Sequence, residues 1–290
     1  EPAWEPWETR LSDPVSGEVR LTGRLSRLPG ARSIVVVVHG LGGTPFTPYS
    51  NRAASACLAA GASCLRLALR GADREGTDFY HAGLTRDLVA ALESPEVSAH
   101  ERVHFLGYSL GGHVTLRLAS EEAGRSLRSV AAVCPPLDLA LSARAFDEEV
   151  AWAYRRYVLD SLKELYMEIA KRAPVPTPVE RVARVRGLRE WDELTVVPRH
   201  GFESVAQYHA SQSAAHVLDE VGVPALVVAA DEDPVVPAEG VRPYLEAAGA
   251  KLTVHWSRRG GHVGLPWSLD LGQTAPLGVE PQAVAWLLDR

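Results

Sequence analysis

Short runs of apolar residues recur along the chain, separated by segments in which apolar positions have a helical spacing. The run SIVVVV at 33–38 is continuous and β-branched, which is typical of a strand buried on both faces of a parallel sheet. Further strands are expected at 63–69, 102–107, 129–134, 224–230 and 252–257. Helices are expected between them at 47–60, 83–93, 110–122, 238–248 and 280–289. This alternation predicts an α/β protein with a mostly parallel, doubly wound sheet and helices on both faces.

Two segments depart from the alternation. Residues 7–28 alternate polar and apolar positions around turn residues, which predicts an N-terminal hairpin. From about 137 to 220 no strand run occurs, and the composition becomes helical and charged. Ligands of open α/β sheets bind beyond the carboxyl ends of the strands. We therefore expect residues 137–220 to form a helical lid, inserted into an α/β core made of residues 1–136 and 221–290.

Composition and charge narrow the class of protein. Hydrophobic residues are 46% and charged residues 23%, as in ordinary globular proteins. The net charge of -6 argues against nucleic acid or an anionic membrane as the main partner. No apolar stretch approaches the roughly 20 residues of an integral membrane segment. The sequence specifies no oligomeric state.

Three cysteines, Cys57, Cys64 and Cys134, lie in apolar surroundings without the spacing of a metal site. We expect buried free thiols, which favour a cytoplasmic protein. The chain begins EPAWEPWE without a methionine, and the loss of an N-terminal targeting segment is compatible with that start.

The stretch GYSLGGHVTL at 107–116 follows an expected strand and opens an expected helix. Strand, Gly-x-Ser-x-Gly and helix in this order are the context of a nucleophile elbow. Gly107 and Gly111 leave room for a tight, strained turn. Ser109 would stand at a helix N-terminus, where free N–H groups favour developing negative charge. We therefore expect a catalytic nucleophile here rather than a structural serine.

A serine nucleophile needs a base and an acid that orients the base, and on this type of fold the acid precedes the histidine in the chain. The segment DEDPVVP follows one expected strand, and GGHVGL follows the next. His262 is the expected base, because the two glycines before it favour an open loop. Asp233 is the expected acid. Asp231 is better suited to capping the loop backbone, although a contribution beside Asp233 stays open.

The oxyanion hole is expected to use two backbone N–H groups. One belongs to Leu110, directly after the nucleophile, and the other to Leu41 in the loop HGLGGT. In the same loop, Gly40 is a candidate for substrate contact, and His39 is expected to hold the loop by hydrogen bonds. His113, one helical turn beyond the nucleophile, is a further substrate-binding candidate, with helix packing as the favoured alternative.

Aromatic and aliphatic residues of the expected lid either line an acyl pocket or form the core of the lid itself, and their amphipathic spacing favours the core. They are Trp152, Tyr154, Tyr157, Leu162, Leu165 and Tyr166. Trp152 and Tyr157 are the substrate-binding candidates among them.

Motifs spread over about residues 30–270 resemble the α/β-hydrolase superfamily, and within it the YheT-like branch of predicted esterases. That branch includes fungal medium-chain ethyl-ester synthase/esterases and animal phospholipid-acting relatives. The motifs are HGLGGT at 39–44, RGADREGTDFYHAGLTRDL at 70–88, GYSLGG at 107–112, LREWDELTVVPRHGFESVAQYHASQS at 188–213, DEDPVVP at 231–237 and GGHVGL at 260–265.

The resemblance implies hydrolysis or transfer of an acyl group from a carboxylic ester, with Ser109, Asp233 and His262 as the triad. Arg70, His81 and Asp87 match positions of the family, and we expect them to form a polar network beneath the rim of the site. The family often has asparagine where this chain has His113, so the role of that residue stays open.

The expected function is therefore that of a serine carboxylic-ester hydrolase, which acts through an acyl-enzyme on short- to medium-chain acyl esters and needs no metal or organic cofactor. An acyltransferase or ester synthase with the same triad is the alternative among enzymes. A non-catalytic binding protein of the same fold is less favoured, because binding alone does not need the full set of catalytic residues.

Overall fold

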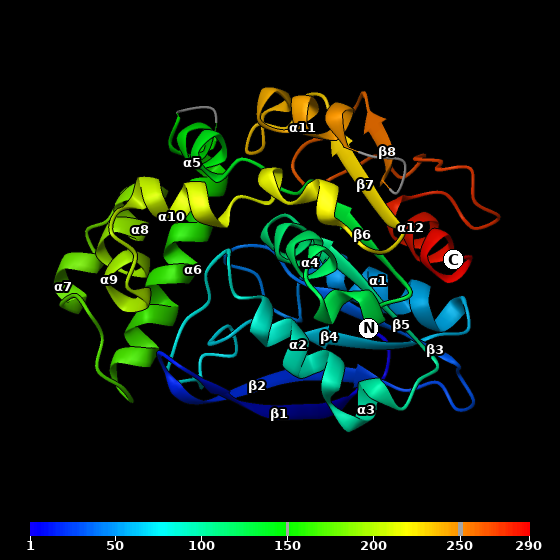
Figure 1. The fold of residues 1–290 in the computed structure, drawn as a ribbon, viewed down its shortest axis with the longest axis horizontal. Coiled ribbons are helices and arrows are strands. Elements are labelled where there is room, and N and C mark those ends of the chain that lie inside the picture. Colours follow the sequence, from blue (N-terminus) through cyan, green and yellow to red (C-terminus); the bar gives the residue numbers. More distant parts are fainter. Residues whose placement is uncertain (149–150, 249–251) are drawn as a thin grey trace.

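An eight-stranded sheet forms the centre of the computed structural model, which describes residues 1–148, 151–248 and 252–290 (Figure 1). The strand order is β1-β2-β4-β3-β5-β6-β7-β8. The strands are β1 (Glu5–Asp13), β2 (Gly17–Ser26), β3 (Ser33–Val38), β4 (Ser63–Leu67), β5 (Arg102–Tyr108), β6 (Ser129–Val133), β7 (Ala225–Ala230) and β8 (Leu252–Ser257). The first two form an antiparallel hairpin joined antiparallel to β4, and the other neighbours pair in parallel. The predicted hairpin and the mostly parallel sheet are confirmed.

Helices cover both faces of the sheet. Two of them, α1 (Pro48–Ala59) and α12 (Val279–Leu288), pack on one face. The opposite face carries α2 (Thr85–Glu93), α3 (Pro95–Ser98) and α4 (Leu110–Ser120). Successive side chains of β3 point alternately to these two layers, so that Val35 and Val37 join one apolar cluster while Val36 and Val38 join the other. Burial on both faces explains why this strand is apolar without interruption.

The helix expected at 238–248 is wrong as a single element. The chain forms a short 3-10 turn at Ala238–Gly240, followed by α11 at Arg242–Ala247. Pro243 lies in the first turn of α11, where its missing N–H is tolerated. A continuous helix through this position would lose a backbone hydrogen bond at the proline and clash with its ring.

The connection from β6 to β7 holds the remaining helices, which gather at one end of the sheet, on the left of Figure 1. They are α5 (Leu139–Asp147), α6 (Trp152–Ala170), α7 (Val179–Val182), α8 (Leu188–Leu194), α9 (Val196–His200) and α10 (Val205–Gln212). In its described part this connection contains no strand. These helices lie between two strands of the sheet, and we refer to them as the insertion.

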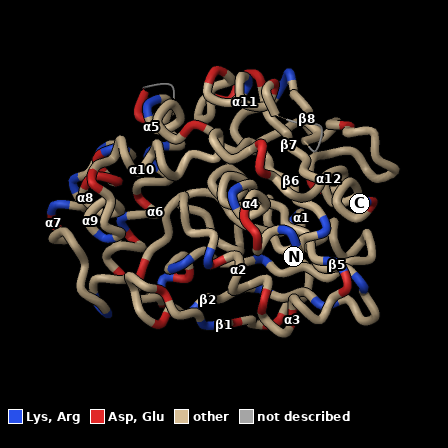
Figure 2. The backbone as a smooth tube through the Cα atoms, viewed as in Figure 1, with Lys and Arg blue, Asp and Glu red and all other residues tan. Residues whose placement is uncertain are grey.

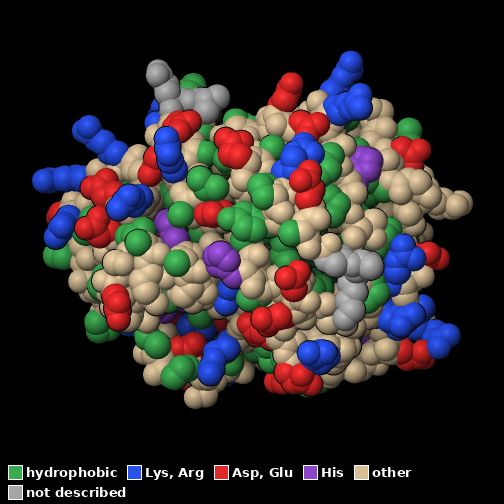
Figure 3. Space-filling view, turned by 45° about the horizontal axis from the view of Figure 1, so that its top comes forward, with side chains coloured by type: hydrophobic (Ala, Val, Ile, Leu, Met, Phe, Trp, Pro, Cys, Tyr) green, Lys and Arg blue, Asp and Glu red, His purple; other side chains and the backbone are tan. Residues whose placement is uncertain are grey.

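The surface mixes both signs of charge. Basic and acidic residues are both spread along the whole backbone (Figure 2), and their side chains are interspersed on the face shown in Figure 3. No helix in the described ranges is long and apolar enough to cross a bilayer. All three cysteines are buried and free, as predicted.

Arg70 is the centre of a buried ion cluster. Its guanidinium lies 3.0 Å from Asp13 of β1, 2.9 Å from Asp78 and 2.6 Å from Asp87 of α2. Asp78 also pairs at 2.9 Å with Arg199 of α9. Burial raises the pKa of Asp87, although Arg70 opposes this effect. The cluster thereby joins the hairpin, α2 and the insertion.

The predicted polar network thus contains Arg70 and Asp87 but not His81. The Nδ1 atom of His81 accepts the N–H of Gly83 at 3.0 Å, and its ring packs against His200 with 4.3 Å between centroids. His81 lines the pocket described below instead.

Replacing Arg70 by methionine should destabilise the fold by about 3–5 kcal/mol, because it leaves buried carboxylates without their counter-ion. The free energy of unfolding from urea titration measures the effect. The matched control is Arg32→Met, since Arg32 and its partner Glu101 are 70% and 57% exposed. We expect the control to stay within about 0.5 kcal/mol of the unmodified chain. Equal losses in both variants would contradict a central role for the cluster.

Candidate active site

The turn between β5 and α4 presents Ser109 in a strained conformation. Its φ and ψ are 52° and -121°, a region that side-chain-bearing residues rarely adopt. The turn is tight enough to require glycine on both sides. A Cβ on Gly107 would lie 2.3 Å from the Gly111 oxygen, and one on Gly111 would lie 2.3 Å from the Val38 oxygen. The Ser109 N–H donates to the Val133 carbonyl at 2.8 Å, which ties the turn to β6.

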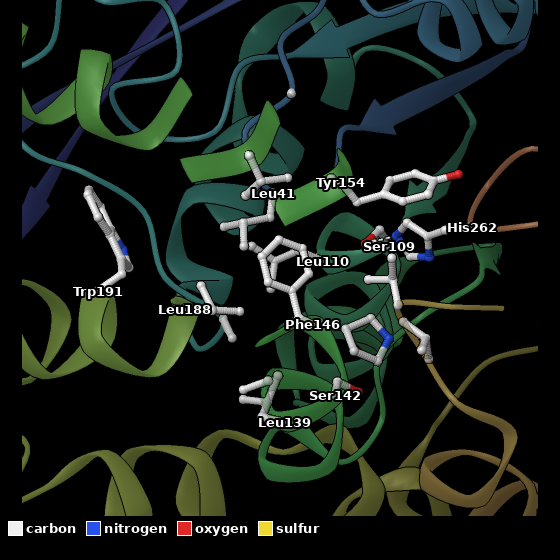
Figure 4. A pocket seen from close by; sticks show the side chains of 18 of the residues that line it. Leu41, Ser109, Leu110, Leu139, Ser142, Phe146, Tyr154, Leu188, Trp191 and His262 are labelled. Atoms are coloured by element: carbon white, nitrogen blue, oxygen red, sulfur yellow. Dashed lines mark hydrogen bonds between the residues drawn. The ribbon is translucent and has the colours of Figure 1, made fainter. Parts of the chain in front are cut away.

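His262 lies between Ser109 and Asp233 in one chain of hydrogen bonds. Its Nε2 is 2.7 Å from Ser109 Oγ, and its Nδ1 is 2.9 Å from Asp233 Oδ2. A carboxylate can only accept, so Nδ1 carries the proton, and Nε2 is left to accept the hydroxyl of Ser109. The structure thus brings together the three residues predicted as a triad, from the loops that follow β5, β7 and β8. Figure 4 shows Ser109 beside His262 at one end of a pocket.

Asp233 is held as an ionised group. Burial opposes ionisation, but the hydrogen bond and charge of His262 and the N–H groups of Val235 and Val236, both at 2.9 Å, lower its pKa. Asp231, the open alternative, pairs with Arg242 near the surface at 2.5 Å. Asp233 is therefore the carboxylate that contacts the histidine.

The loop after β3 has a fixed peptide orientation at Gly40–Leu41. The Gly40 carbonyl accepts from His39 Nδ1 at 2.8 Å and from the Gly43 N–H at 3.0 Å. Because the peptide is planar and trans, these two donors turn the Leu41 N–H to the opposite side. Within the described residues, the N–H groups of Leu41 and Leu110 have no protein acceptor, and both residues line the pocket with Ser109.

His39 holds this loop as the sequence predicts. Its Nε2 accepts the N–H of Leu69 at 3.1 Å, while its Nδ1 donates to Gly40. Burial lowers its pKa to about 4, so the ring is neutral at physiological pH and has one donor and one acceptor nitrogen. Tyr49 and Tyr80 accept the N–H groups of Gly40 and Gly42 at 3.0 and 2.7 Å.

A mainly apolar pocket of about 210 Å³ extends from Ser109 into the insertion. In Figure 4, Ser109 and His262 lie at one side, and Leu188 and Trp191 lie at the other. The insertion supplies much of the apolar lining, including Phe146, Tyr154, Tyr157, Val158, Leu188 and Trp191. The arrangement can therefore place an apolar chain beside the serine hydroxyl.

The remaining substrate-binding candidates have different places. Gly40 lines the pocket against Ser109, and Tyr157 lines it from α6. Trp152 does not line it: as the first residue of α6 it is 58% exposed. His113 is also outside the pocket, because its ring is buried against the carbonyls of Pro136 and Gln212 at 2.6 and 2.9 Å. Trp152 is therefore a correction to the sequence-based prediction. For His113 the substrate-binding role is also corrected, in favour of the packing role that the sequence analysis preferred.

The other candidates from the insertion divide between pocket lining and packing. Tyr154 faces the pocket with its ring centroid 6.0 Å from that of His262. Leu162, Leu165 and Tyr166 are buried in the helical core of the insertion.

Several polar pocket residues were not singled out from the sequence. Among them are Ser142 of α5, Asp192 of α8 and His209 of α10. The motif at 188–213 contains the last two and was the available signal, but a motif does not show which of its side chains face a pocket. No group of three or more His, Cys, Asp or Glu side chains in the described ranges is arranged to hold a metal ion.

The chain belongs to the alpha/beta hydrolase family, whose model matches residues 35–272. The putative esterase YheT of Escherichia coli is 29% identical over 238 residues, which cover 79% of this chain and 69% of that protein. A medium-chain fatty acid ethyl ester synthase/esterase of Saccharomyces cerevisiae is 25% identical over 70% of this chain and 51% of its own length. The chain thus spans about half of the yeast relative. These relatives confirm the resemblance to YheT-like esterases.

Solved structures agree with the fold. An esterase of Pyrococcus furiosus superimposes with a TM-score of 0.58 at 14% identity, covering 89% of this chain and 84% of that one. A hydrolase from Pseudomonas aeruginosa gives a TM-score of 0.55 at 21% identity, covering 88% and 91%. At these identities the likeness concerns the α/β-hydrolase fold alone.

Replacing Gly111 by alanine should destabilise the fold by about 1–3 kcal/mol, because its Cβ would meet the backbone of β3, which cannot rotate away. Thermal unfolding followed by circular dichroism measures the loss. Gly222→Ala is the matched control, since a Cβ there would first meet the flexible side chain of Arg125 at 3.4 Å. If the two alanines cost the same, the close approach is not what restricts position 111.

Proposed function

We propose that the protein is a serine carboxylic-ester hydrolase that acts through an acyl-enzyme on short- to medium-chain acyl esters. The observation that carries the proposal is the hydrogen-bonded series Ser109, His262 and Asp233 at one end of an apolar pocket. The esterase names of its relatives support the reaction class. A nucleophile, a base and an orienting acid in this geometry are what acyl transfer requires.

In the first half-reaction, the Ser109 hydroxyl loses its proton to His262 Nε2 while Oγ attacks the ester carbonyl carbon. Asp233 stabilises the imidazolium that results. The negative charge that forms on the carbonyl oxygen is held by the N–H groups of Leu41 and Leu110; each such donor typically contributes about 2.7–4 kcal/mol to lowering the barrier. The tetrahedral intermediate then expels the alcohol, which takes the proton from His262 and leaves an acyl group on Ser109.

In the second half-reaction, His262 removes a proton from a water molecule that attacks the acyl-enzyme. The same two N–H groups stabilise the second tetrahedral intermediate. Its collapse returns the proton to Ser109 and releases the carboxylic acid. Every proton transfer uses the one histidine, so the chemistry needs no metal or organic cofactor.

The pocket limits the acyl group by size and polarity. Its volume of about 210 Å³ lies below the roughly 300–1,000 Å³ of sites for drug-sized ligands, which favours short to medium chains. The helices of the insertion supply much of the pocket wall. We therefore assign residues 137–220 the role of a lid on the pocket. The yeast relative is named for medium-chain fatty acid ethyl esters.

Ser109→Ala should lower kcat/KM for p-nitrophenyl esters by about 10⁴- to 10⁶-fold, because the nucleophile is lost. Esters with acyl chains from two to twelve carbons should show a length optimum in the unmodified chain. Ser120→Ala, at the other end of α4, is the matched control and should retain activity. Turnover that survives in Ser109→Ala would refute the triad. Absence of turnover in the unmodified chain, together with no labelling by a fluorophosphonate, would refute the triad and favour a binding protein.

Added ethanol distinguishes hydrolysis from ester synthesis with the same triad. An ester hydrolase should release free acid as the main product at ethanol concentrations up to about one-tenth that of water, because water reaches the same acyl-enzyme. Gas chromatography of the products measures the ratio of free acid to ethyl ester. A predominance of ethyl ester would assign the chain to acyl transfer, the alternative suggested by the name of the yeast relative.

A further inference from the structure

A buried acid–base pair lies in the wall of the pocket, outside the catalytic series. Asp192 of α8 and His209 of α10 are each 6% exposed, and Asp192 Oδ2 is 2.9 Å from His209 Nε2. Both residues line the pocket. Among the described residues, the second oxygen of Asp192 and the Nδ1 of His209 have no protein partner. The pair therefore keeps unused hydrogen-bonding capacity in a mainly apolar wall.

Ser142 adds a second, independent observation. It lines the same pocket from α5 and is 7% exposed, yet its buried Oγ has no hydrogen-bond partner among the described residues. A helical serine usually satisfies its hydroxyl on the carbonyl one turn earlier, as Thr195 does at 2.7 Å on Trp191. A buried hydroxyl without a hydrogen-bond partner lowers the free energy of unfolding, and the large majority of buried polar groups in folded proteins have a partner.

The three polar residues come from helices that pack on one another. Asp147 of α5 accepts the N–H of Leu188 at the start of α8, and the Leu139 N–H at the start of α5 donates to Ser213 at 3.0 Å, just after α10. Asp192 follows Leu188 by four residues, so the two share a face of α8. Figure 4 places Leu188 and Trp191 on the side of the pocket away from Ser109 and His262. The polar groups thus belong to the insertion rather than to the catalytic loops.

We propose that Ser142, Asp192 and His209 form a specificity subsite for a hydroxyl group carried on the acyl chain, several carbons from the ester carbonyl. This inference rests on the proposed ester hydrolysis and names its substrate class: esters of hydroxylated, medium-chain acids. A hydroxyl both donates and accepts, so it complements the free atoms of the pair and the free Oγ together.

Other polar groups fit less well. A substrate carboxylate would be repelled by Asp192. The described part of the pocket also has no unpaired cation to compensate for the free energy that desolvation of the carboxylate costs. A purely apolar chain would leave all three polar groups without partners and cut off from water. A site that hydrogen-bonds a substrate hydroxyl discriminates strongly against the analogue that lacks it.

The test compares p-nitrophenyl hexanoate, octanoate and decanoate with their ω-hydroxy derivatives. At one chain length, the unmodified enzyme should show a kcat/KM about 10- to 100-fold higher for the hydroxylated ester than for its parent. The ratio should fall at least about 10-fold in Ser142→Ala and in Asp192→Asn. Ser142→Ala removes an unsatisfied buried hydroxyl, so it should not impair folding.

Ser55→Ala, on the exposed side of α1, is the matched control and should keep the ratio of the unmodified enzyme. A ratio below one at every length, or a ratio unchanged in both pocket variants, would overturn the inference while leaving ester hydrolysis intact. Absence of turnover with all six esters would instead refute the proposed function. In that event, calorimetric titration with octanoate and 8-hydroxyoctanoate makes the same comparison. Tighter binding of the hydroxy acid that is lost in Ser142→Ala supports the subsite. Equal binding of the two acids overturns it.

Discussion

The backbone around Ser109 approaches the end of β3 more closely than any side chain at position 111 would allow. Gly111 faces the Val38 carbonyl, and Gly107 faces Gly111 itself. This contact sets the start of α4 against the loop after β3, and Leu110 and Leu41 line the same pocket as Ser109. The strained φ of Ser109 is maintained because β3 and β6 pair with β5 on both sides and fix the strand that leads into the turn.

The loop after β3 is held by groups from several parts of the chain. His39 and two tyrosines fix its peptides, and Ser161 of α6 donates to the Gly42 carbonyl at 2.8 Å. Arg74 in turn donates to Ser161 at 2.7 Å. The insertion is therefore joined by hydrogen bonds to the same loop that carries a proposed oxyanion donor. A shift of α6 would be transmitted to that loop through a direct contact.

The proposed chemistry and the proposed selectivity come from different parts of the molecule. The loops at the carboxyl ends of the parallel strands hold the proposed catalytic series, in the region where open α/β sheets bind their ligands. The insertion supplies much of the pocket wall, where apolar residues accompany the polar group formed by Ser142, Asp192 and His209. Substrate choice can therefore change through the insertion while the strand loops keep the reaction.

Local patterns in the sequence were enough to predict the sheet and the positions of Ser109, Asp233 and His262. The central strands are largely apolar, and each of the three residues follows a predicted strand within a short motif. The single helix expected at 238–248 failed because Pro243 interrupts it. Only the tertiary structure decided that Trp152 faces solvent, that His113 packs away from the pocket, and that Asp192 meets His209. These outcomes depend on how the helices of the insertion pack across the strand ends, and amphipathic spacing within one helix does not say which neighbour its apolar face will meet.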